Sequence, residues 1–81
     1  MKLEELINTV NESIQSNSKD GSIKPVQLAK IVGVREQMIY RYISDRRIKS
    51  FETPGGYKRV KVDEAIRWSN LYLTRKFDRE S

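Results

Sequence analysis

Apolar residues recur at helical spacing at the start of the chain. They are Leu3, Leu6, Ile7, Val10 and Ile14. The residues between them are polar or acidic, so the pattern predicts an amphipathic helix that ends by Ser16 or Asn17. The polar run SNSKDGS over residues 16–22 combines small side chains with a glycine, which predicts a flexible connector. We therefore expect an N-terminal helix within residues 1–17 and a connector over 18–24.

Two shorter helical patterns occupy residues 25–44. They read PVQLAKIV and REQMIYRYIS, and Gly33 lies between them. Pro25 suits the first position of a helix, because the N–H that proline lacks has no partner there. Gly33 suits the left-handed position at which a helix ends. The region is predicted to form two helices joined by a tight turn of about three residues.

An alternating pattern begins after Asp45. Phe51, Val60 and Val62 can share one face of a β-hairpin within residues 48–62, and the sequence Pro-Gly-Gly at 54–56 is a strong turn signal. If the two glycines form a two-residue loop, Phe51 lies opposite Val60. This register would set an apolar residue against an apolar residue.

A last helix is predicted over residues 63–78, with Asp63 as its N-cap. Its apolar residues form two adjacent stripes: Ile66, Leu73 and Phe77, and Ala65, Trp68 and Tyr72. The expected fold is mainly α with a small β-hairpin. Its order is a helix, a pair of helices around a turn, the hairpin and a closing helix.

Composition excludes several classes of protein. A chain of 81 residues has room for one compact domain. The absence of cysteine excludes disulfide frameworks and Cys-based zinc sites, and no apolar run approaches the ~18 residues of a membrane span. We expect a cytoplasmic protein with no membrane partner, no metal and no cofactor.

Positive charge is concentrated in the middle of the chain. Residues 30–61 hold nine cations and three acids, a net charge of +6, whereas the whole chain carries +5. The remaining residues therefore carry a net charge of −1. Such a basic segment favours a polyanion as its partner.

The paired helices match the spacing of a helix-turn-helix. Counted from Pro25 as position 1, Ala29 is the small residue at position 5 and Gly33 is the glycine at position 9. The apolar positions 4, 8, 10, 15 and 18 hold Leu28, Val32, Val34, Ile39 and Tyr42. The small residue allows close crossing, the glycine makes the turn, and the apolar residues hold the pair to the domain. The alternative is an αα-hairpin that binds no ligand.

If Ile39 and Tyr42 point inward, a helical period turns one polar face outward. That face comprises Glu36, Gln37, Tyr40, Arg41 and Ser44. In a DNA major groove, glutamine can pair with adenine, arginine with guanine, and glutamate can accept from cytosine. The alternative is an ordinary solvated face, on which Glu36 is a first-turn carboxylate favoured by the helix dipole.

The hairpin tip carries Tyr57, Lys58 and Arg59 beside its glycines. A glycine tip can approach another backbone closely, and cations beside it can contact phosphates or a narrow minor groove. The alternative is that the lysine only protects an edge strand from aggregation.

The run LAKIVGVREQMIYRYISDRRIKSFETPGGYKRVKVDEAIRW resembles the winged helix-turn-helix of excisionase-type and MerR-type DNA-binding proteins. The resemblance covers residues 23–68. It implies a recognition helix from Glu36 to Ser44 in the major groove and a wing from Phe51 to Val62 on the adjacent backbone or minor groove. It also brings Arg46 and Arg47, in the motif RRIKSF, into the candidate site.

Two departures from the family pattern affect the candidate site. The family usually has a capping Ser or Thr where Arg35 stands, and commonly a similar cap where Lys24 stands. Arg35 has no side-chain acceptor for a cap, and we expect it to contact a phosphate instead. The resemblance does not include the effector-binding region of full MerR regulators, so no small-molecule effector is expected.

These observations predict a sequence-preferring protein that binds double-stranded DNA without catalysis. It would act in the cytoplasm on the nucleoid, as a transcriptional regulator or as an excisionase-like factor in DNA recombination. Because one module buries limited surface, we expect self-association or adjacent copies on DNA. The alternative is a protein-interaction module that uses the stripe Leu3, Leu6 and Val10. An enzyme is disfavoured, since the sequence has no His, no Cys and no phosphate-binding glycine motif.

Overall fold

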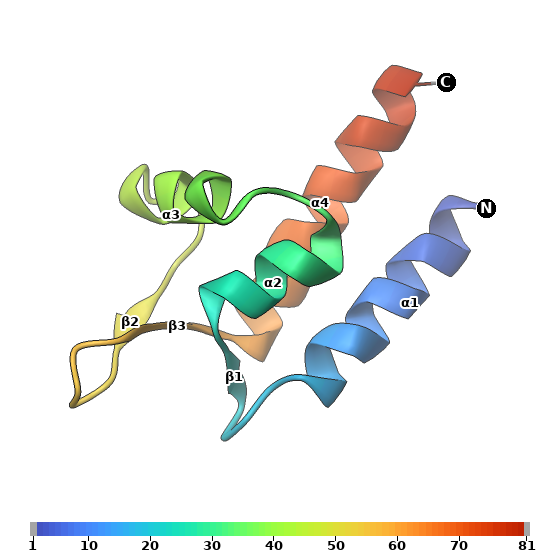
Figure 1. The fold of residues 1–81 in the computed structure, drawn as a ribbon. Helices are drawn as coiled ribbons and strands as arrows, with labels where there is room; N and C mark the ends of the chain where they lie inside the picture. Colours follow the sequence, from blue (N-terminus) through green and yellow to red (C-terminus); the bar gives the residue numbers. More distant parts are fainter. Residues whose placement is uncertain (1, 81) are drawn as a thin grey trace.

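The computed structural model describes residues 2–80, apart from the side chain of Glu80. Its fold is mainly helical with a small antiparallel sheet, as the sequence predicts (Figure 1). The helices are α1 (Leu3–Ser16), α2 (Pro25–Val32), α3 (Glu36–Ser44) and α4 (Val62–Glu80). The strands are β1 (Ser22–Ile23), β2 (Phe51–Glu52) and β3 (Lys58–Lys61).

The turn between α2 and α3 has the conformation predicted for it. Gly33 ends α2 with a φ of 86°, in the left-handed region, and its N–H donates to the carbonyl of Ala29 at 2.8 Å. The N–H of Val34 donates to the same carbonyl at 3.0 Å. These bonds satisfy the end of α2, so that α3 can begin at Glu36 in a new direction.

The segment predicted as a flexible connector forms an ordered turn and a strand. Lys19 and Ser22 exchange backbone hydrogen bonds of 2.7 and 3.1 Å, while Asp20 and Gly21 adopt φ values of 56° and 75°. Positive φ at both central residues is the geometry that Asp-Gly favours in a two-residue turn. The following strand β1 pairs with β3, with Ile23 opposite Val60. The sequence prediction missed β1 because two residues are too few to show an alternating pattern.

The predicted hairpin register is wrong by one residue. Phe51 lies opposite Arg59, and Val60 pairs instead with Ile23 of β1, because β3 is the central strand of the order β1-β3-β2. The loop has three residues, since the N–H of Thr53 donates to the carbonyl of Tyr57 at 2.8 Å across residues 54–56. Gly56 alone of the two loop glycines has a positive φ, of 83°. A β-turn followed by a left-handed glycine is the common three-residue hairpin.

The last helix begins one residue before its predicted cap. It starts at Val62, and Asp63 therefore lies in the first turn with Glu64, where the helix dipole favours negative charge. Of the two predicted stripes, Ala65, Trp68 and Leu73 are buried. Phe77 is 39% exposed, because it lies beyond the part of α4 that the core covers.

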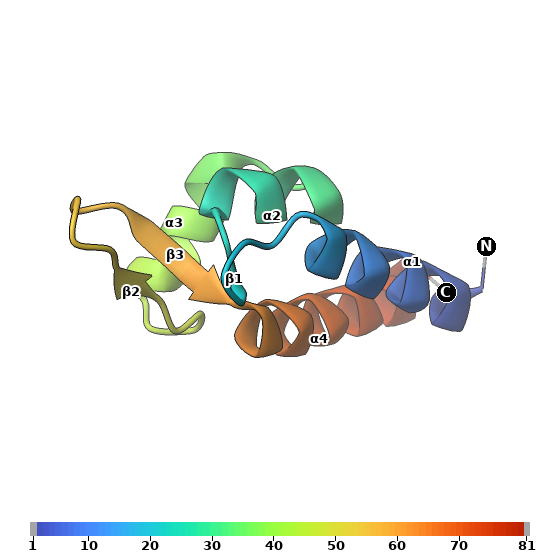
Figure 2. The ribbon, with the colours of Figure 1, turned by 90° about the horizontal axis from the view of Figure 1, so that it is seen from below.

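One core joins all four helices and the sheet. Its members are Val10, Ile14, Ile23, Leu28, Ala29, Ile39, Ile43, Ile48, Val60, Ala65, Trp68 and Leu73. Helix α1 lies along α4 in both views of the ribbon (Figures 1 and 2). The apolar face of α1 is therefore covered by the chain itself. Among residues 2–80, no helix is long and apolar enough to cross a membrane.

Candidate nucleic-acid interface

Helix α3 exposes the polar face expected from its sequence. Glu36, Gln37, Tyr40, Arg41 and Ser44 are all exposed. The opposite positions Ile39 and Ile43 are buried in the core. Because the helical period separates these two sets, α3 is anchored by two isoleucines and presents its glutamine and arginine to solvent.

The N-terminus of α3 has no side-chain cap. Arg35 occupies the N-cap position with extended backbone, and its exposed side chain makes no capping hydrogen bond. Lys24 occupies the N-cap position of α2, again with extended backbone and no capping hydrogen bond from its side chain. Both helices thus begin with a cation at the position where a neutral or acidic acceptor is usual.

The β2–β3 hairpin projects from the sheet on the same side of the molecule as α3, away from both termini (Figures 1 and 2). Tyr57 is 75% exposed and Lys58 is exposed, so both are available at the tip. The N–H of Tyr57 donates to Oγ1 of Thr53 at 3.2 Å, which ties the two ends of the loop together.

Arg59 differs from its neighbours because its guanidinium is engaged within the fold. Its Nε donates to Oγ of Ser22 at 2.6 Å, and its Nη2 donates to the carbonyls of Ser22 and Lys19 at 3.0 and 3.4 Å. The side chain is half-buried. Arg59 thus binds the β1 turn to the central strand.

A depression of about 300 Å³ joins the exposed face of α3 to the hairpin. The depression is lined by Tyr40 of α3, by Thr53, Tyr57, Lys58 and Arg59 of the hairpin, and by Pro25 and Val26 of α2 with Lys24 just before them. Tyr40 therefore lies where the helix face and the hairpin meet. Of the five α3 residues predicted for the site, Tyr40 is the one that shares this depression with the hairpin.

Arg46 and Arg47 follow α3 but diverge in direction. Arg46 is exposed and has a φ of 62°, a left-handed conformation that reverses the chain after the helix. The guanidinium carbon of Arg47 lies 5.8 Å from the centroid of the Tyr42 ring, and Arg47 lines a groove against α4. Tyr42 lies about 200° around the helix from Tyr40. Arg47 is thereby separated from the exposed polar face of α3.

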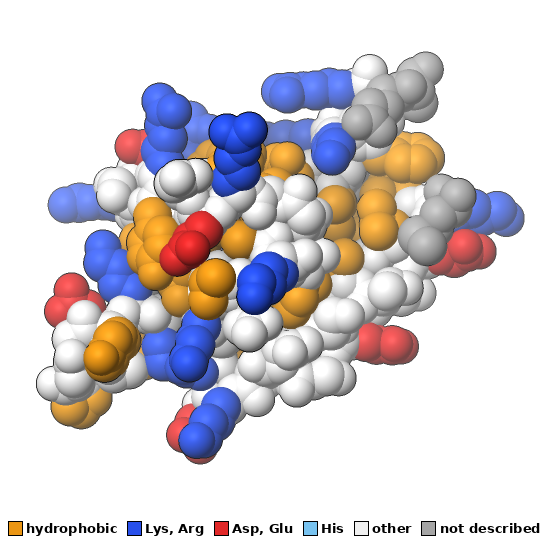
Figure 3. Space-filling view, viewed as in Figure 1, with side chains coloured by type: hydrophobic (Ala, Val, Ile, Leu, Met, Phe, Trp, Pro, Cys, Tyr) orange, Lys and Arg blue, Asp and Glu red, His pale blue; other side chains and the backbone are white. Residues whose placement is uncertain are grey.

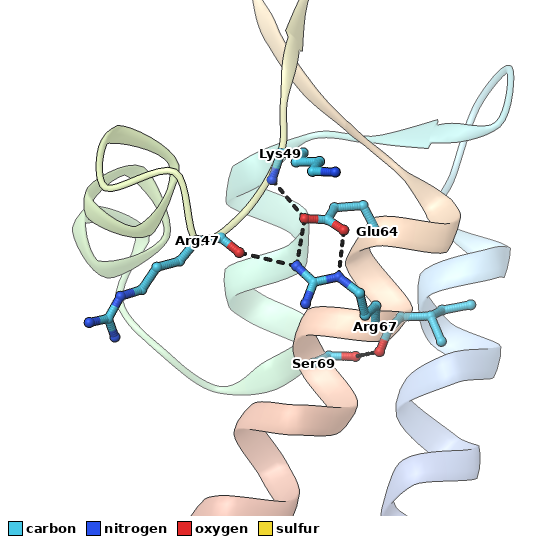
Figure 4. A network of polar contacts seen from close by, with 6 residues as sticks. Arg47, Lys49, Glu64, Arg67 and Ser69 are labelled. Carbon is cyan, nitrogen blue, oxygen red and sulfur yellow. Dashed lines mark hydrogen bonds and ion pairs between the residues drawn. The ribbon is translucent and has the colours of Figure 1, made fainter.

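Glu64 ties the segment after α3 to α4, although its sequence position indicates only a helix start. Its Oε2 accepts from the backbone N–H of Lys49 at 2.7 Å, and Nε and Nη2 of Arg67 donate to its two oxygens at 2.7 and 2.8 Å (Figure 4). Nη2 of Arg67 also donates to the carbonyl of Arg47 at 3.2 Å. The hydrogen bond from Arg67, with a lesser contribution from the Lys49 N–H, holds the pKa of Glu64 below its ordinary value.

The cluster of Glu64 and Arg67 fixes the segment after α3 to the first turns of α4. Because this segment leads from α3 into β2, the cluster restrains the chain between the helix and the hairpin. The spacing of Glu64 and Arg67 by three residues is a signal for a helical ion pair. No sequence pattern indicates the hydrogen bonds that Glu64 and Arg67 make to the backbone of Lys49 and Arg47.

Basic side chains gather over α3, the hairpin and the far part of α4 in the space-filling view (Figure 3). Over α1, on the right of the same view, acidic side chains are prominent. The same view also shows acidic side chains among the basic ones over α3 and the hairpin, so that this side of the molecule carries mixed charge.

We compared the chain with known proteins. No family model matches it, and neither the curated proteins nor the solved structures contain a match.

Proposed function

We propose that the protein binds double-stranded DNA as a winged helix-turn-helix, with α3 as the recognition helix and the β2–β3 hairpin as the wing. The proposal is supported above all by the depression that Tyr40 shares with the hairpin tip. It brings one residue of the exposed face of α3, Tyr40, together with the tip residues of the hairpin. A duplex with its major groove on α3 would meet the wing at the adjacent backbone.

The polar face of α3 supplies the chemistry for reading bases. A major groove about 12 Å wide admits one α-helix. Arg41 can donate two hydrogen bonds to guanine, and Gln37 can pair with adenine. Glu36 can accept from a cytosine amino group, while Tyr40 and Ser44 complete the contact surface.

The cations around this face supply attraction to phosphates. Lys58 stands at the wing tip beside the uncharged Tyr57, Arg35 stands at the start of α3 and Arg46 follows its end. In this proposal Arg59 organises the wing, because its guanidinium already bonds to Ser22. Arg47 is given no part in it, because its guanidinium lies over the Tyr42 ring and the residue lines the groove beside α4.

We also propose that the protein acts without catalysis, as a transcriptional regulator or an architectural recombination factor. The alternative of an interaction module built on the apolar face of α1 is weakened by packing. Leu3 and Leu6 pack against the core, and Val10 is 4% exposed. The apolar residues of this stripe are therefore already packed against the core of the chain itself.

The test is selection of bound genomic fragments, followed by fluorescence anisotropy on a selected duplex and on a random duplex. The logarithm of the affinity should fall with the logarithm of salt concentration by about 0.9 per phosphate neutralised. Arg41→Ala should weaken binding to the selected duplex by about 1–3 kcal/mol and binding to the random duplex much less. Leu71→Ala, an exposed change on α4, is the matched control. Equal losses on the two duplexes, or affinity that ignores salt, would refute the proposal.

A further inference from the structure

A second and larger groove lies between the end of α3 and the outer face of α4. Its volume is about 740 Å³. Five of the residues that line it are cationic: Arg47, Arg67, Arg75, Lys76 and Arg79. Its other lining residues are Tyr42, Trp68, Leu71 and Tyr72, so the groove combines an apolar floor with a basic rim.

The floor of the groove is preorganised by aromatic contacts. The rings of Tyr42 and Trp68 have centroids 5.5 Å apart at a tilt of 55°, and Trp68 stacks on Tyr72 at 5.3 Å and 17°. Trp68 is 6% exposed and anchors this row in the core, while Leu71 beside it is 47% exposed. An occupant would thus meet an ordered apolar surface at little cost in side-chain entropy.

The groove follows the axis of α4. Arg67, Leu71, Arg75 and Arg79 recur every four residues and form one stripe, and Trp68, Tyr72 and Lys76 form the next. At 1.5 Å per residue, the stripe from Arg67 to Arg79 extends over about 18 Å, which is the length of about three turns of a helix. This shape suits an elongated partner that lies along α4.

The charge of the groove is strongly unbalanced. Arg67 is paired with Glu64, and among the residues whose side chains are described, those that line the groove include no acid beside Arg47, Arg75, Lys76 and Arg79. Like charges along one helix face repel each other, and carboxylates from a partner would relieve that repulsion.

We propose that this groove binds an acidic amphipathic helix of a partner protein. The apolar residues of that helix would rest on Leu71 and Tyr72, and its carboxylates would flank them to meet the arginines. This is the helix-in-groove mode of recognition, with charge complementarity setting the direction and the on-rate.

The packing disfavours other occupants. Single-stranded nucleic acid needs free ring faces for stacking, whereas Trp68 and Tyr72 stack on each other and Arg47 lies over Tyr42. A second copy of this chain could offer the exposed Glu4, Glu5 and Glu12 of α1, but the apolar side of α1 is already packed in the core. A second copy would therefore bring negative charge but no free apolar surface to match the floor of the groove.

The experiment uses the full chain and a fluorescein-labelled synthetic helix of about four turns. The probe carries leucines at i, i+4 spacing with glutamates on both sides. Binding measured by anisotropy should fall at least about tenfold in the double variant R75E/R79E and in L71A. Arg41→Glu, on the exposed polar face of α3 and outside the groove lining, should leave it unchanged. Circular dichroism melting of each variant confirms that the fold is retained.

Two further probes make the test decisive. A probe with lysine for glutamate should not bind, and one with serine for leucine should bind at least about tenfold more weakly. Equal binding of the leucine and serine probes, or no binding of the acidic probe, would overturn the proposal. So would displacement of the probe by duplex DNA, which would assign the groove to the DNA surface. A dimer of the protein that R75E/R79E disrupts would assign it to a second copy.

Discussion

Nε of Arg59 donates a hydrogen bond of 2.6 Å to Oγ of Ser22, across 37 residues of sequence. The bond joins the hairpin to the turn after α1, and Ser22 is itself 4% exposed. It explains why two neighbouring cations in the hairpin have different roles. Lys58 is exposed at the tip, whereas Arg59 is part of the sheet.

Arg59→Ala is therefore expected to lower stability more than it lowers affinity for DNA. Loss of these partly buried hydrogen bonds should cost about 1–2 kcal/mol in the free energy of unfolding. Lys58→Ala should leave stability unchanged and weaken DNA binding with a smaller salt slope. Urea denaturation and anisotropy measure the two effects. A double-mutant cycle of Arg59→Ala with Ser22→Ala should be non-additive, and additive losses would contradict the pairing.

The bonds of Glu64 predict a dependence of stability on pH. The hydrogen bond from Arg67 lowers the pKa of Glu64 in the folded state, so its carboxylate stabilises the fold above the unfolded pKa. This contribution is lost as the pH falls from about 4.3 through the lowered folded value. Glu64→Gln should reduce the melting temperature at pH 7. It should also make the melting temperature fall less steeply as the pH is lowered. Glu12→Gln, an exposed change on α1, is the matched control for the substitution.

Helix α1 should behave as part of the core. Ile14 has no exposed surface, so Ile14→Ala should cost about 2–5 kcal/mol in the free energy of unfolding. Phe77→Ala removes a larger side chain, but that side chain is 39% exposed, and we expect a change within about 0.5 kcal/mol. Chemical denaturation compares the two. Equal small effects would mean that α1 does not contribute to the cooperative fold.

The parts of this fold that were predictable are those with long patterns. The four helices follow apolar periods of eight residues or more, and Gly33 marks the turn because its φ of 86° suits glycine. The sequence Pro-Gly-Gly admits either a two-residue or a three-residue loop. The choice depends on which glycine adopts a positive φ, and pairing of the central strand β3 with β1 settles where Val60 lies.

The candidate site was predictable to a similar extent and for a related reason. Helical spacing identifies which α3 side chains are exposed, because it depends only on near neighbours. Local spacing does not identify which of the cations form hydrogen bonds or ring contacts within the fold. Arg59 bonds to Ser22 and Arg47 lies over Tyr42, and both contacts depend on tertiary packing. The tie between Glu64 and the segment after α3 is not predictable from spacing, because the partner of its carboxylate is the backbone N–H of Lys49, 15 residues away.

The two consecutive arginines after α3 give the last prediction. Arg46 and Arg47 are both exposed, but the guanidinium of Arg47 lies over the Tyr42 ring and its carbonyl accepts from Arg67. If α3 enters the major groove, Arg46→Ala should reduce the slope of log affinity against log salt by about 0.9, the amount for one phosphate contact. Arg47→Ala should leave the slope unchanged and weaken binding of the acidic helical probe instead. Because the two residues are adjacent and of the same type, each variant is the control for the other. A reversed pattern would mean that the duplex lies against α4 rather than against the exposed face of α3.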